Sequence, residues 1–412
     1  MELNSRISEN VEFVLLVEPN FPIPAKSRNH SNFLPIGLLK LASYFRSKNI
    51  DIKLVRHNSD DFKLIEENLK PDLIFITSIF TYWAKYVKKT VEYYRKLYPS
   101  TPIIVGGIYA SLMPDQCLEY TKCDEVITGI VEEAEKLIPA YDLVNVDYQI
   151  IHTTRGCIRR CDCCGVYEIE PKWTSKESIK EEIVKPKIIF YDNNILANPN
   201  IRNILQELIE LKKKKKISYI ESQSGFDGRL LVKNPHLAKL IKKAGFKNPK
   251  IAWDGPLSDE KNIKQQIDIL KEAGYASKDI SVFMLYNHIL DYNIMEEKRV
   301  KCFEWGVQVT DCRFRPLDII EDNYNPQKRT GQNNDDYYIH DNWTDSSIRQ
   351  FRRNIRRHNI CVRLGTSYHS SLSERKKIPH QIAKKYIKAS FKEALNHIHD
   401  AWDPSVFHEI QD

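Results

Sequence analysis

The sequence predicts an α/β fold: an N-terminal doubly wound, Rossmann-like parallel sheet domain, a (βα)6 partial TIM barrel and a mostly helical C-terminal extension. Two observations support this prediction. Short apolar runs alternate with helical patterns of ten or more residues, as crossovers in a parallel sheet require, and the alternation occurs twice. A pattern-poor stretch at 139–150 separates the two series. We therefore expect domains at 1–140, 141–316 and 317–412.

The composition is that of a globular protein. The chain has 412 residues, with 62 Lys and Arg against 55 Asp and Glu, and 42% of its residues are hydrophobic. These values exclude collagen-like, low-complexity and wholly disordered chains, and the length suits two or three domains. No stretch approaches the ~20 uninterrupted apolar residues that a membrane helix requires, and the first residues lack the basic region of a signal peptide. We therefore expect a cytoplasmic protein.

The first domain alternates short apolar strands with amphipathic helices. Its strands are expected at 11–17, 51–57, 72–78, 102–106 and 125–129, and its helices at 35–49, 60–69 and 82–98. Pro35 stands at the start of the first helix, where its missing N–H costs nothing. The ligand crevice of such a sheet lies beyond the carboxyl ends of its strands, so we expect a binding site there.

Six βα units follow the linker. Their strands are expected at 148–157, 187–194, 217–225, 250–255, 280–287 and 307–316, separated by helical patterns such as 201–216 and 261–275. Six units are too many for a small flavodoxin-like sheet and suit an incomplete barrel, whose loops at the strand carboxyl ends carry the chemistry. Beyond residue 316, a polar, turn-rich stretch is expected to form an ordered excursion or lid. Helices at 346–358 and 378–399 then close the chain.

Four of the nine cysteines crowd into eight residues directly after the first barrel strand. Cys157, Cys161 and Cys164 have the spacing C-x3-C-x2-C, which lets one loop ligate three irons of a cubic iron–sulfur cluster and leaves the fourth iron open. A structural zinc site needs four ligands, usually in two separated pairs, and no second pair exists in the sequence. His152 and Cys163 nevertheless keep zinc open as an alternative. Cys163 falls outside the spacing, and we expect it to point away from the cluster.

This motif in this place resembles the radical S-adenosylmethionine (SAM) enzymes. In that family a C-x3-C-x2-C loop follows the first strand of a (βα)6 partial barrel, as Cys157, Cys161 and Cys164 do here. The resemblance implies a 4Fe-4S cluster whose open iron binds the amino and carboxylate groups of SAM. It further implies one-electron cleavage of SAM to a 5′-deoxyadenosyl radical that abstracts hydrogen from an unactivated carbon, with the protein supplying the positioning.

The first domain is similar to the cobalamin-binding domain that precedes the barrel in a large subgroup of these enzymes. The likeness rests on LPIGLLKLASYFRSKNIDI, VGGIYASLMPDQCLEY and DEVITGIVEEA, and on Ser78–Phe80 where the family often has Ser-x-Leu. Two features depart from the family. The Asp-x-His-x-x-Gly signature that supplies an axial histidine is absent, and Gly129–Glu132 replaces the usual Gly-Glu-Gly-Glu. The alternative is a Rossmann-like domain that binds nothing and serves as an interaction platform.

The cobalamin resemblance implies roles for five residues. Thr77 and Ser78, at a strand end, would meet the nucleotide tail of cobalamin. Gly106 and Gly107 would let the backbone approach the corrin closely, since glycine carries no side chain. Tyr109 is expected to help shape the pocket, as are aromatic and amide side chains from the later strands.

Polar residues at the ends of the barrel strands are candidate SAM contacts. Asp192 and Asn193 stand where many family members place the residues that meet the SAM amino group, although such residues also occur as plain turn formers. Ser224 and Asp227 follow the third strand and Asp254 follows the fourth. The resemblance implies that these positions contact the ribose and methionine moieties.

Two arginines on the sixth strand are candidate catalytic residues. Arg313 and Arg315 alternate, so both side chains are expected to point to one face. If that face is the barrel interior, a cation is costly unless it has a task, such as gripping a substrate carboxylate bidentately. If it is the outer face, both arginines are simply solvated.

Residues 348–357 predict an amphipathic helix with an arginine face. Ile348, Phe351 and Ile355 form its apolar stripe, and the rest is shared by Arg349, Arg352, Arg353, Arg356 and Arg357. Such a face suits an acidic partner, RNA phosphates or the carboxylates of cobalamin and SAM, or it is only solvated. The lysine run at 212–216 is expected to be solvated at a helix end. Because the net charge is modest and no aromatic-interleaved basic patch exists, we do not expect a nucleic-acid partner.

Together these features predict a cobalamin-dependent radical SAM C-methyltransferase, in which methylcobalamin delivers the methyl group and SAM is both radical source and remethylating agent. TSIFTYW, RFRPLD and the stretch at 342–360 also resemble enzymes that methylate a side-chain carbon of methyl-coenzyme M reductase. The expected partners are a substrate protein or small molecule and an electron donor such as flavodoxin or ferredoxin, with no membrane. Two alternatives stay open: a cobalamin-binding radical SAM enzyme of non-methylating or methylthiolating type, and a non-catalytic zinc protein that binds nucleic acid.

Overall fold

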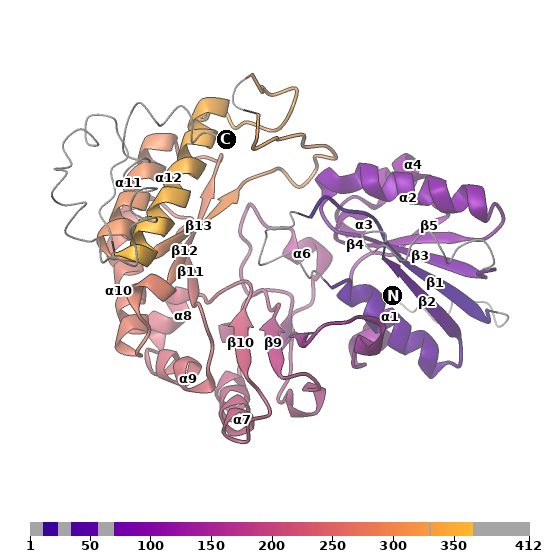
Figure 1. The fold of residues 1–412 in the computed structure, drawn as a ribbon, viewed down its shortest axis with the longest axis horizontal. Coiled ribbons are helices and arrows are strands. Elements are labelled where there is room, and N and C mark those ends of the chain that lie inside the picture. The colour runs from indigo at the N-terminus through magenta and orange to yellow at the C-terminus, as the bar shows by residue number, and fades with distance from the viewer. Residues whose placement is uncertain (1–10, 24–33, 57–69, 329–330, 366–412) are drawn as a thin grey trace, which may run out of the picture. The chain divides into compact units, whose positions relative to one another are not determined.

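The computed structural model describes residues 11–23, 34–56, 70–328 and 331–365 (Figure 1). The described chain forms two compact units. The first runs to Lys247 and includes the later segment 315–322, and the second contains the other residues from Asn248 onward. Each unit is described by itself below. The domain boundaries expected at 140 and 316 divide the chain differently and stay predictions.

The N-terminal sheet of the first unit has five parallel strands in the order β2-β1-β3-β4-β5 (Figure 1). They are β1 (Phe13–Glu18), β2 (Asp51–Arg56), β3 (Leu73–Ser78), β4 (Ile103–Gly107) and β5 (Glu125–Val126). Residues 14–17 of β1 are buried on both faces, as the uninterrupted apolar run requires in a sheet covered from two sides. The strands predicted for the first domain are therefore confirmed.

Helices cover both faces of this sheet. On one face the core joins Leu15, Ile74 and Ile76 to helices α2 (Ala84–Leu97), α3 (Ile108–Leu112) and α4 (Pro114–Thr121). On the other, Val14, Leu16 and Phe75 pack on α1 (Ile36–Ser47) and α5 (Glu132–Glu135). Alternate residues of β1 thus face opposite layers, which is the doubly wound arrangement. The helix expected at 60–69 lies outside the described residues.

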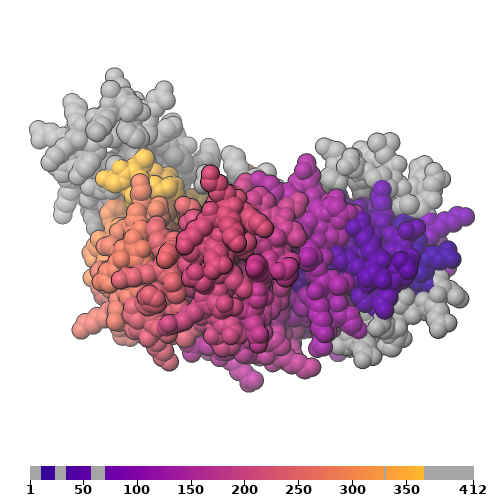
Figure 2. Space-filling view, turned by 90° about the horizontal axis from the view of Figure 1, so that it is seen from below, coloured from indigo at the N-terminus to yellow at the C-terminus, as the bar shows by residue number. Residues whose placement is uncertain are grey.

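A second parallel sheet in the first unit has the order β10-β9-β6, with β6 (Tyr148–Ile151), β9 (Lys187–Phe190) and β10 (Tyr219–Ser222). Its helices include α7 (Ile201–Lys213), α8 (Gly228–Lys233) and α9 (His236–Ala244). The antiparallel pair β7 (Thr154–Arg155) and β8 (Thr174–Ser175) and the short helix α6 (Val166–Ile169) lie between β6 and β9 in the chain. The lysine run at 212–216, expected to be solvated, is exposed, and α7 lies on the face that Figure 2 shows.

The second unit contains the last three predicted strands in one parallel sheet. They are β11 (Lys250–Ala252), β12 (Ser281–Tyr286) and β13 (Gln308–Arg313). Helices α10 (Glu260–Glu272), α11 (Tyr292–Glu304) and α12 (Asp345–Leu364) complete the unit. All six βα strands of the predicted partial barrel are present, three in each unit, and the α/β fold class is confirmed.

Helix α12 extends the predicted 346–358 helix at its C-terminal end. Thr344 caps its start, since the Thr344 hydroxyl accepts from the Ser347 backbone N–H at 3.1 Å and the Ser347 hydroxyl accepts from the Thr344 N–H at 2.9 Å. The Asn359 side chain accepts from the Val309 N–H at 2.8 Å and donates to the Val309 carbonyl at 2.7 Å. It thereby provides hydrogen-bond partners for backbone groups on the outer edge of β13. The helix expected at 378–399 lies outside the described residues. Among the described helices, none is both long and apolar enough to cross a membrane.

Candidate functional site

A pocket with a cavity volume of about 210 Å³, partly open to solvent, lies in the first unit at the carboxyl ends of β3, β4 and β5. The start of α1 and the segment from Gly129 to Glu135 form further walls. Arg155, Ile169 and Glu170 close it from the side of the cysteine loop. The location is the crevice expected for a doubly wound sheet.

The two glycines at the end of β4 have different structural roles. Both line the pocket, but Gly107 has a φ of 100°, and a Cβ there would lie 2.1 Å from the Ser78 carbonyl oxygen. Position 107 therefore requires glycine, because any side chain there would clash with β3. A Cβ on Gly106 would meet only Ile127, at an ordinary 3.7 Å. Gly106 is thus the position where the missing side chain keeps the pocket open.

The other residues expected to hold cobalamin divide between the pocket and the core. Thr77 lines the pocket. Ser78 is buried and does not line the pocket. Its hydroxyl donates to the Gly106 carbonyl at 2.8 Å and accepts from the Ala110 N–H. Tyr109 is fully buried and donates to Gln116 at 2.6 Å, and burial raises the pKa of its phenol. Ser78 and Tyr109 therefore hold the pocket walls without lining the pocket.

The cysteine loop runs from the end of β7 to the start of α6. Cys161 is exposed, while Cys157 and Cys164 are half-buried. Burial raises the pKa of the Cys164 thiol, a hydrogen bond from the Val166 backbone opposes the rise, and Cys157 adds to it. Cys163, outside the motif, is also half-buried.

The donor set of this loop is three thiols on a partly open surface. In the described part of the chain, no three His, Cys, Asp or Glu side chains converge as the ligands of a single metal ion do. The ligands of a cubic cluster bind separate irons and stand farther apart than the ligands of one ion. Thiolates are the ligands that iron–sulfur clusters use, so the chemistry of Cys157, Cys161 and Cys164 fits such a cluster.

Asp192 follows β9 and is almost fully buried, with 1% of its surface exposed. Its Oδ1 accepts four hydrogen bonds of 2.6–2.9 Å from the backbone and hydroxyl groups of Thr153 and Thr154. Its Oδ2 is buried and accepts none from the described residues. Burial raises the pKa of this carboxyl, and the four hydrogen bonds oppose the rise. An unsatisfied buried acceptor fits a donor on a ligand, such as an ammonium group.

The remaining candidate SAM contacts have different surroundings. Asn193 donates to the Gly156 carbonyl at 3.4 Å and to Glu170 at 3.2 Å. Ser224 is exposed. Asp227 caps α8 and pairs with Arg159 of the cysteine loop at 3.1 Å, so the structure shows it positioning that loop.

The residues expected at the ends of β11 and β13 have different local surroundings, and each is described within its own unit. Asp254, in the second unit, is exposed. The Arg313 guanidinium, also in the second unit, lies 4.7 Å from the centre of the Tyr324 ring. Arg315 belongs to the first unit, where it lies 4.3 Å from the Tyr82 ring and 3.3 Å from Asp322. The two arginines contact different aromatic rings, and their role toward a substrate stays a prediction.

The arginine face of α12 requires a correction. It is not a simply solvated face, because one of its five arginines is buried and three are half-buried. Arg349 is 5% exposed and pairs with Asp345 at 2.9 Å. Arg352 pairs with Asp311, and Arg353 donates to Gln350. Arg356 is the exposed member of the set.

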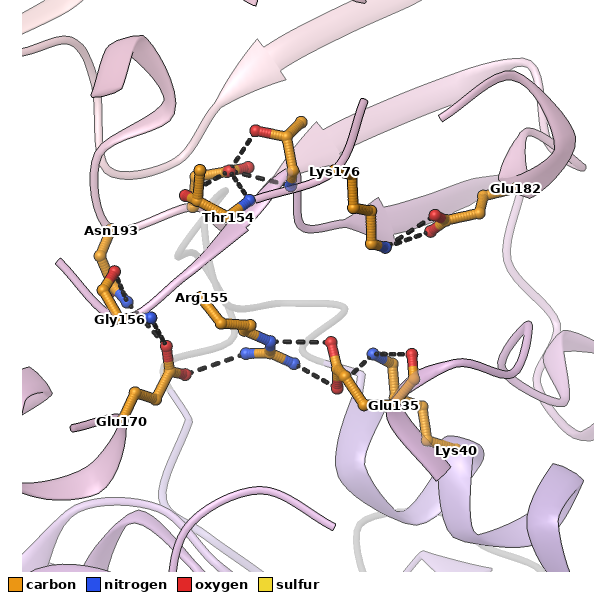
Figure 3. Close-up of polar contacts among 11 residues, drawn as sticks. Lys40, Glu135, Thr154, Arg155, Gly156, Glu170, Lys176, Glu182 and Asn193 are labelled. Carbon is orange, nitrogen blue, oxygen red and sulfur yellow. Dashed lines mark hydrogen bonds and ion pairs between the residues drawn. The ribbon is translucent and has the colours of Figure 1, made fainter. Parts of the chain in front are cut away.

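A chain of charged side chains that the sequence did not reveal borders the pocket (Figure 3). Lys40 of α1 pairs with Glu135 at 2.6 Å, and Glu135 accepts two hydrogen bonds of 2.8 Å from Arg155. Arg155 also donates to Glu170 at 3.0 Å, and Glu170 accepts from the Gly156 N–H at 2.6 Å. Lys40 and Glu135 are 95 residues apart, so no local pattern could have indicated the contact.

Comparison with known proteins adds to this geometry. Residues 30–140 match the family model described as the B12 binding domain. No curated protein matches the sequence. The fold is similar to that of TsrM, a radical S-adenosylmethionine methyltransferase from Kitasatospora setae, in two solved structures, each with a TM-score of 0.55 and 14% identity.

One TsrM structure, with cobalamin and a [4Fe-4S] cluster bound, aligns over 74% of this chain and 75% of its own. The other, with tryptophan substrate and the SAM analogue aza-SAM bound, aligns over 73% and 72%. The chain therefore has the α/β fold of these structures, and its N-terminal domain is similar in sequence to B12-binding domains.

Proposed function

We propose that this protein is a cobalamin-dependent radical SAM methyltransferase. One observation carries the proposal. The pocket at the carboxyl ends of the N-terminal sheet is bordered on its other side by Arg155 and Glu170, which flank the C-x3-C-x2-C loop. Both elements belong to the first unit. The match to B12-binding domains and the fold of a methyltransferase support the same assignment.

Cobalamin would occupy the pocket, where Thr77, Gly106 and Gly129 offer a polar contact and close backbone approach. Cobalamin supplies a cobalt-bound methyl group for transfer. No histidine is among the residues that line this pocket in the described chain, which agrees with the missing Asp-x-His-x-x-Gly signature. The pocket walls are largely aliphatic, from Ile36, Leu41 and Ile127, and would exclude water from the corrin face.

Cys157, Cys161 and Cys164 would hold the 4Fe-4S cluster, and Oδ2 of Asp192 would accept from the SAM amino group. Cluster and SAM together supply a radical by one-electron cleavage. The protein's part is to hold the loop: Asp227 binds Arg159 within it, and Glu170 binds the Gly156 N–H directly before Cys157.

We further propose that the methyl acceptor is an unactivated carbon, on a protein side chain or a small molecule, and that a flavodoxin or ferredoxin in the cytoplasm supplies electrons. Arg313 and Arg315 would bind acidic groups of the substrate. The sequence resemblance to enzymes acting on methyl-coenzyme M reductase supports a protein substrate.

Elemental analysis tests the proposal. The protein is expressed with cobalamin supplied, purified without oxygen and assayed for iron, cobalt and zinc. We expect about four irons per chain, as one 4Fe-4S cluster requires, together with stoichiometric cobalt. Iron without cobalt would leave the N-terminal domain a scaffold and favour a non-methylating enzyme. Zinc without iron would end the radical assignment in favour of a structural zinc protein.

A further inference from the structure

The charged network of Lys40, Glu135, Arg155 and Glu170 contributes both to the pocket and to the start of the cysteine loop. All four side chains line the pocket. Two of them also fix the start of the cysteine loop, since Arg155 is the second residue before Cys157 and Glu170 accepts from the Gly156 N–H. Figure 3 shows Arg155 between the two carboxylates. The side chains that a pocket ligand would touch are therefore those that set the path of the loop.

Several contacts hold this end of the loop in one position. Arg155 grips Glu135 with two parallel hydrogen bonds of 2.8 Å, a geometry specific to a guanidinium and a carboxylate. Gly156 has a φ of 72°, and a Cβ there would lie 2.8 Å from the Lys172 carbonyl oxygen. Asn193 binds the Gly156 carbonyl and the same Glu170 oxygen. Side chains and backbone therefore leave the residue before Cys157 little freedom.

The network is also electrically balanced and shielded from water. Lys40 and Arg155 carry two positive charges, and Glu135 and Glu170 carry two negative ones. Their side chains are between 11% and 18% exposed. Removing one member leaves an uncompensated, partly buried charge, and its former partners must rearrange. A change at the pocket wall is therefore transmitted to the loop through direct contacts.

We propose that Arg155 is a positioning residue that couples the pocket to the cysteine loop, so that cobalamin binding and cluster binding strengthen each other. This inference rests on the proposed function. Coupling of this kind is reciprocal: if the cluster raises the affinity for cobalamin, cobalamin stabilises the cluster by the same factor. Arg155 would act through Glu135 and Glu170 and would not itself touch the reacting atoms.

The test measures the dissociation constant of hydroxocobalamin by absorbance titration, on protein with the cluster reconstituted and on protein freed of iron. For the unaltered protein we expect affinity at least about fivefold higher with the cluster, the lower end of common coupling factors. In Arg155→Gln the two constants should become equal. Arg155→Lys should keep part of the difference, because lysine can bind one carboxylate but cannot span both.

Two further variants keep the test decisive. Arg46→Gln is the matched control, because Arg46 also lies on the N-terminal domain and binds Asp142 with two hydrogen bonds, at 3.0 and 2.9 Å, but both side chains are exposed and away from the pocket. It should keep the full coupling. Glu170→Gln preserves the Glu135–Arg155 pair and should still lower the ratio, which guards against a folding defect specific to Arg155→Gln.

A spectroscopic readout separates positioning from simple stabilisation. With dithionite in excess, which reduces the cluster and converts hydroxocobalamin to cob(II)alamin, bound cobalamin should shift the electron paramagnetic resonance spectrum of the cluster in the unaltered protein and in Arg46→Gln, but not in Arg155→Gln, after the cob(II)alamin signal is subtracted. Undiminished coupling in Arg155→Gln, or equal constants in the unaltered protein, would overturn the inference and leave the proposed function standing. A failure of the unaltered protein to bind hydroxocobalamin would overturn both.

Discussion

Buried charges are arranged differently in the two units. In the first unit, Lys40, Glu135, Arg155 and Glu170 alternate in sign along the wall of a cavity. In the second, the inward-facing charges of α12 are mostly of one sign, and they contact aromatic rings and backbone carbonyls as well as carboxylates. Tyr324, for example, has the guanidinium groups of Arg313, Arg349 and Arg352 within 5.2 Å of its ring centre.

The contrast shows that an arginine-rich segment and a pocket-lining ion network are distinguished by their partners and not by their composition. Arg349 binds Asp345, Gln332 and the carbonyls of Asn325 and Lys328, so every direction of its guanidinium is used inside the unit. The first-unit network borders space that a ligand can enter. We therefore expect substitutions in the second unit to change stability and substitutions around the first-unit pocket to change cofactor binding.

The largest expected effect is the loss of SAM cleavage when the cysteine triad is broken. Replacing Cys157, Cys161 or Cys164 with Ala should abolish iron incorporation and SAM turnover, because each is expected to ligate a separate iron. Cys163→Ala is the control and should retain most of both. Iron analysis and chromatographic measurement of SAM consumption give the comparison, and equal loss in all four variants would show that the ligands are misassigned.

Arg349→Ala should destabilise the second unit by about 3 kcal/mol, since it leaves the carbonyls of Asn325 and Lys328 without this donor and the half-buried Asp345 carboxylate with only its bond from Tyr337. Arg356→Ala, on the same helix but exposed, should change the free energy of unfolding by less than about 0.5 kcal/mol. Denaturant unfolding followed by circular dichroism measures both. Similar values for the two variants would contradict the inward orientation of Arg349.

The paired glycines sharpen the comparison within the first unit. Gly107→Ala should destabilise the N-terminal sheet by about 1–3 kcal/mol for its backbone conformation, with the contact to Ser78 adding to the loss. Gly106→Ala should leave stability nearly unchanged and weaken hydroxocobalamin binding, because its new methyl group narrows the pocket. Thermal unfolding and cobalamin titration separate the two effects. A destabilised Gly106→Ala with normal cobalamin affinity would argue against a cofactor at this wall.

The last expected effect is a pH dependence in the second unit. Burial lowers the pKa of His358 from 6.5 to about 3. Its Nε2 donates to the Val307 carbonyl at 2.7 Å, and its Nδ1 lies 3.4 Å from Arg299, whose charge also disfavours a second proton. The Phe303 ring packs edge-on against it.

Between pH 3 and 6.5 the unfolded chain binds more protons at this position than the folded chain, so stability should rise with pH across that window. His358→Gln should make the free energy of unfolding depend less steeply on pH. Urea unfolding at several pH values in the window measures it, and an unchanged slope in the variant would show that other groups carry the acid sensitivity.

Strands and cysteine spacing could be predicted from the sequence because both are local. Apolar runs such as 14–17 are buried on two faces wherever the sheet is covered twice, and the motif at Cys157–Cys164 is contained in one loop. The charged network could not be predicted, since its members come from α1, α5 and the segments flanking the cysteine loop. The arginine face was misjudged for a similar reason: its partners include Asp311 on β13 and the carbonyls of the excursion after it.

The segment 315–322 returns from the second unit to the first and completes it late in synthesis. A Cβ on Gly165, directly after the last motif cysteine, would lie 3.1 Å from Leu317, and Ile320 packs on the core cluster of the N-terminal sheet. Arg315 stacks on Tyr82 beside Asp322. A nascent chain therefore cannot finish its N-terminal unit until residue 322 has left the ribosome. The packing beside the end of the cysteine loop is therefore completed by residues made long after the cysteines themselves.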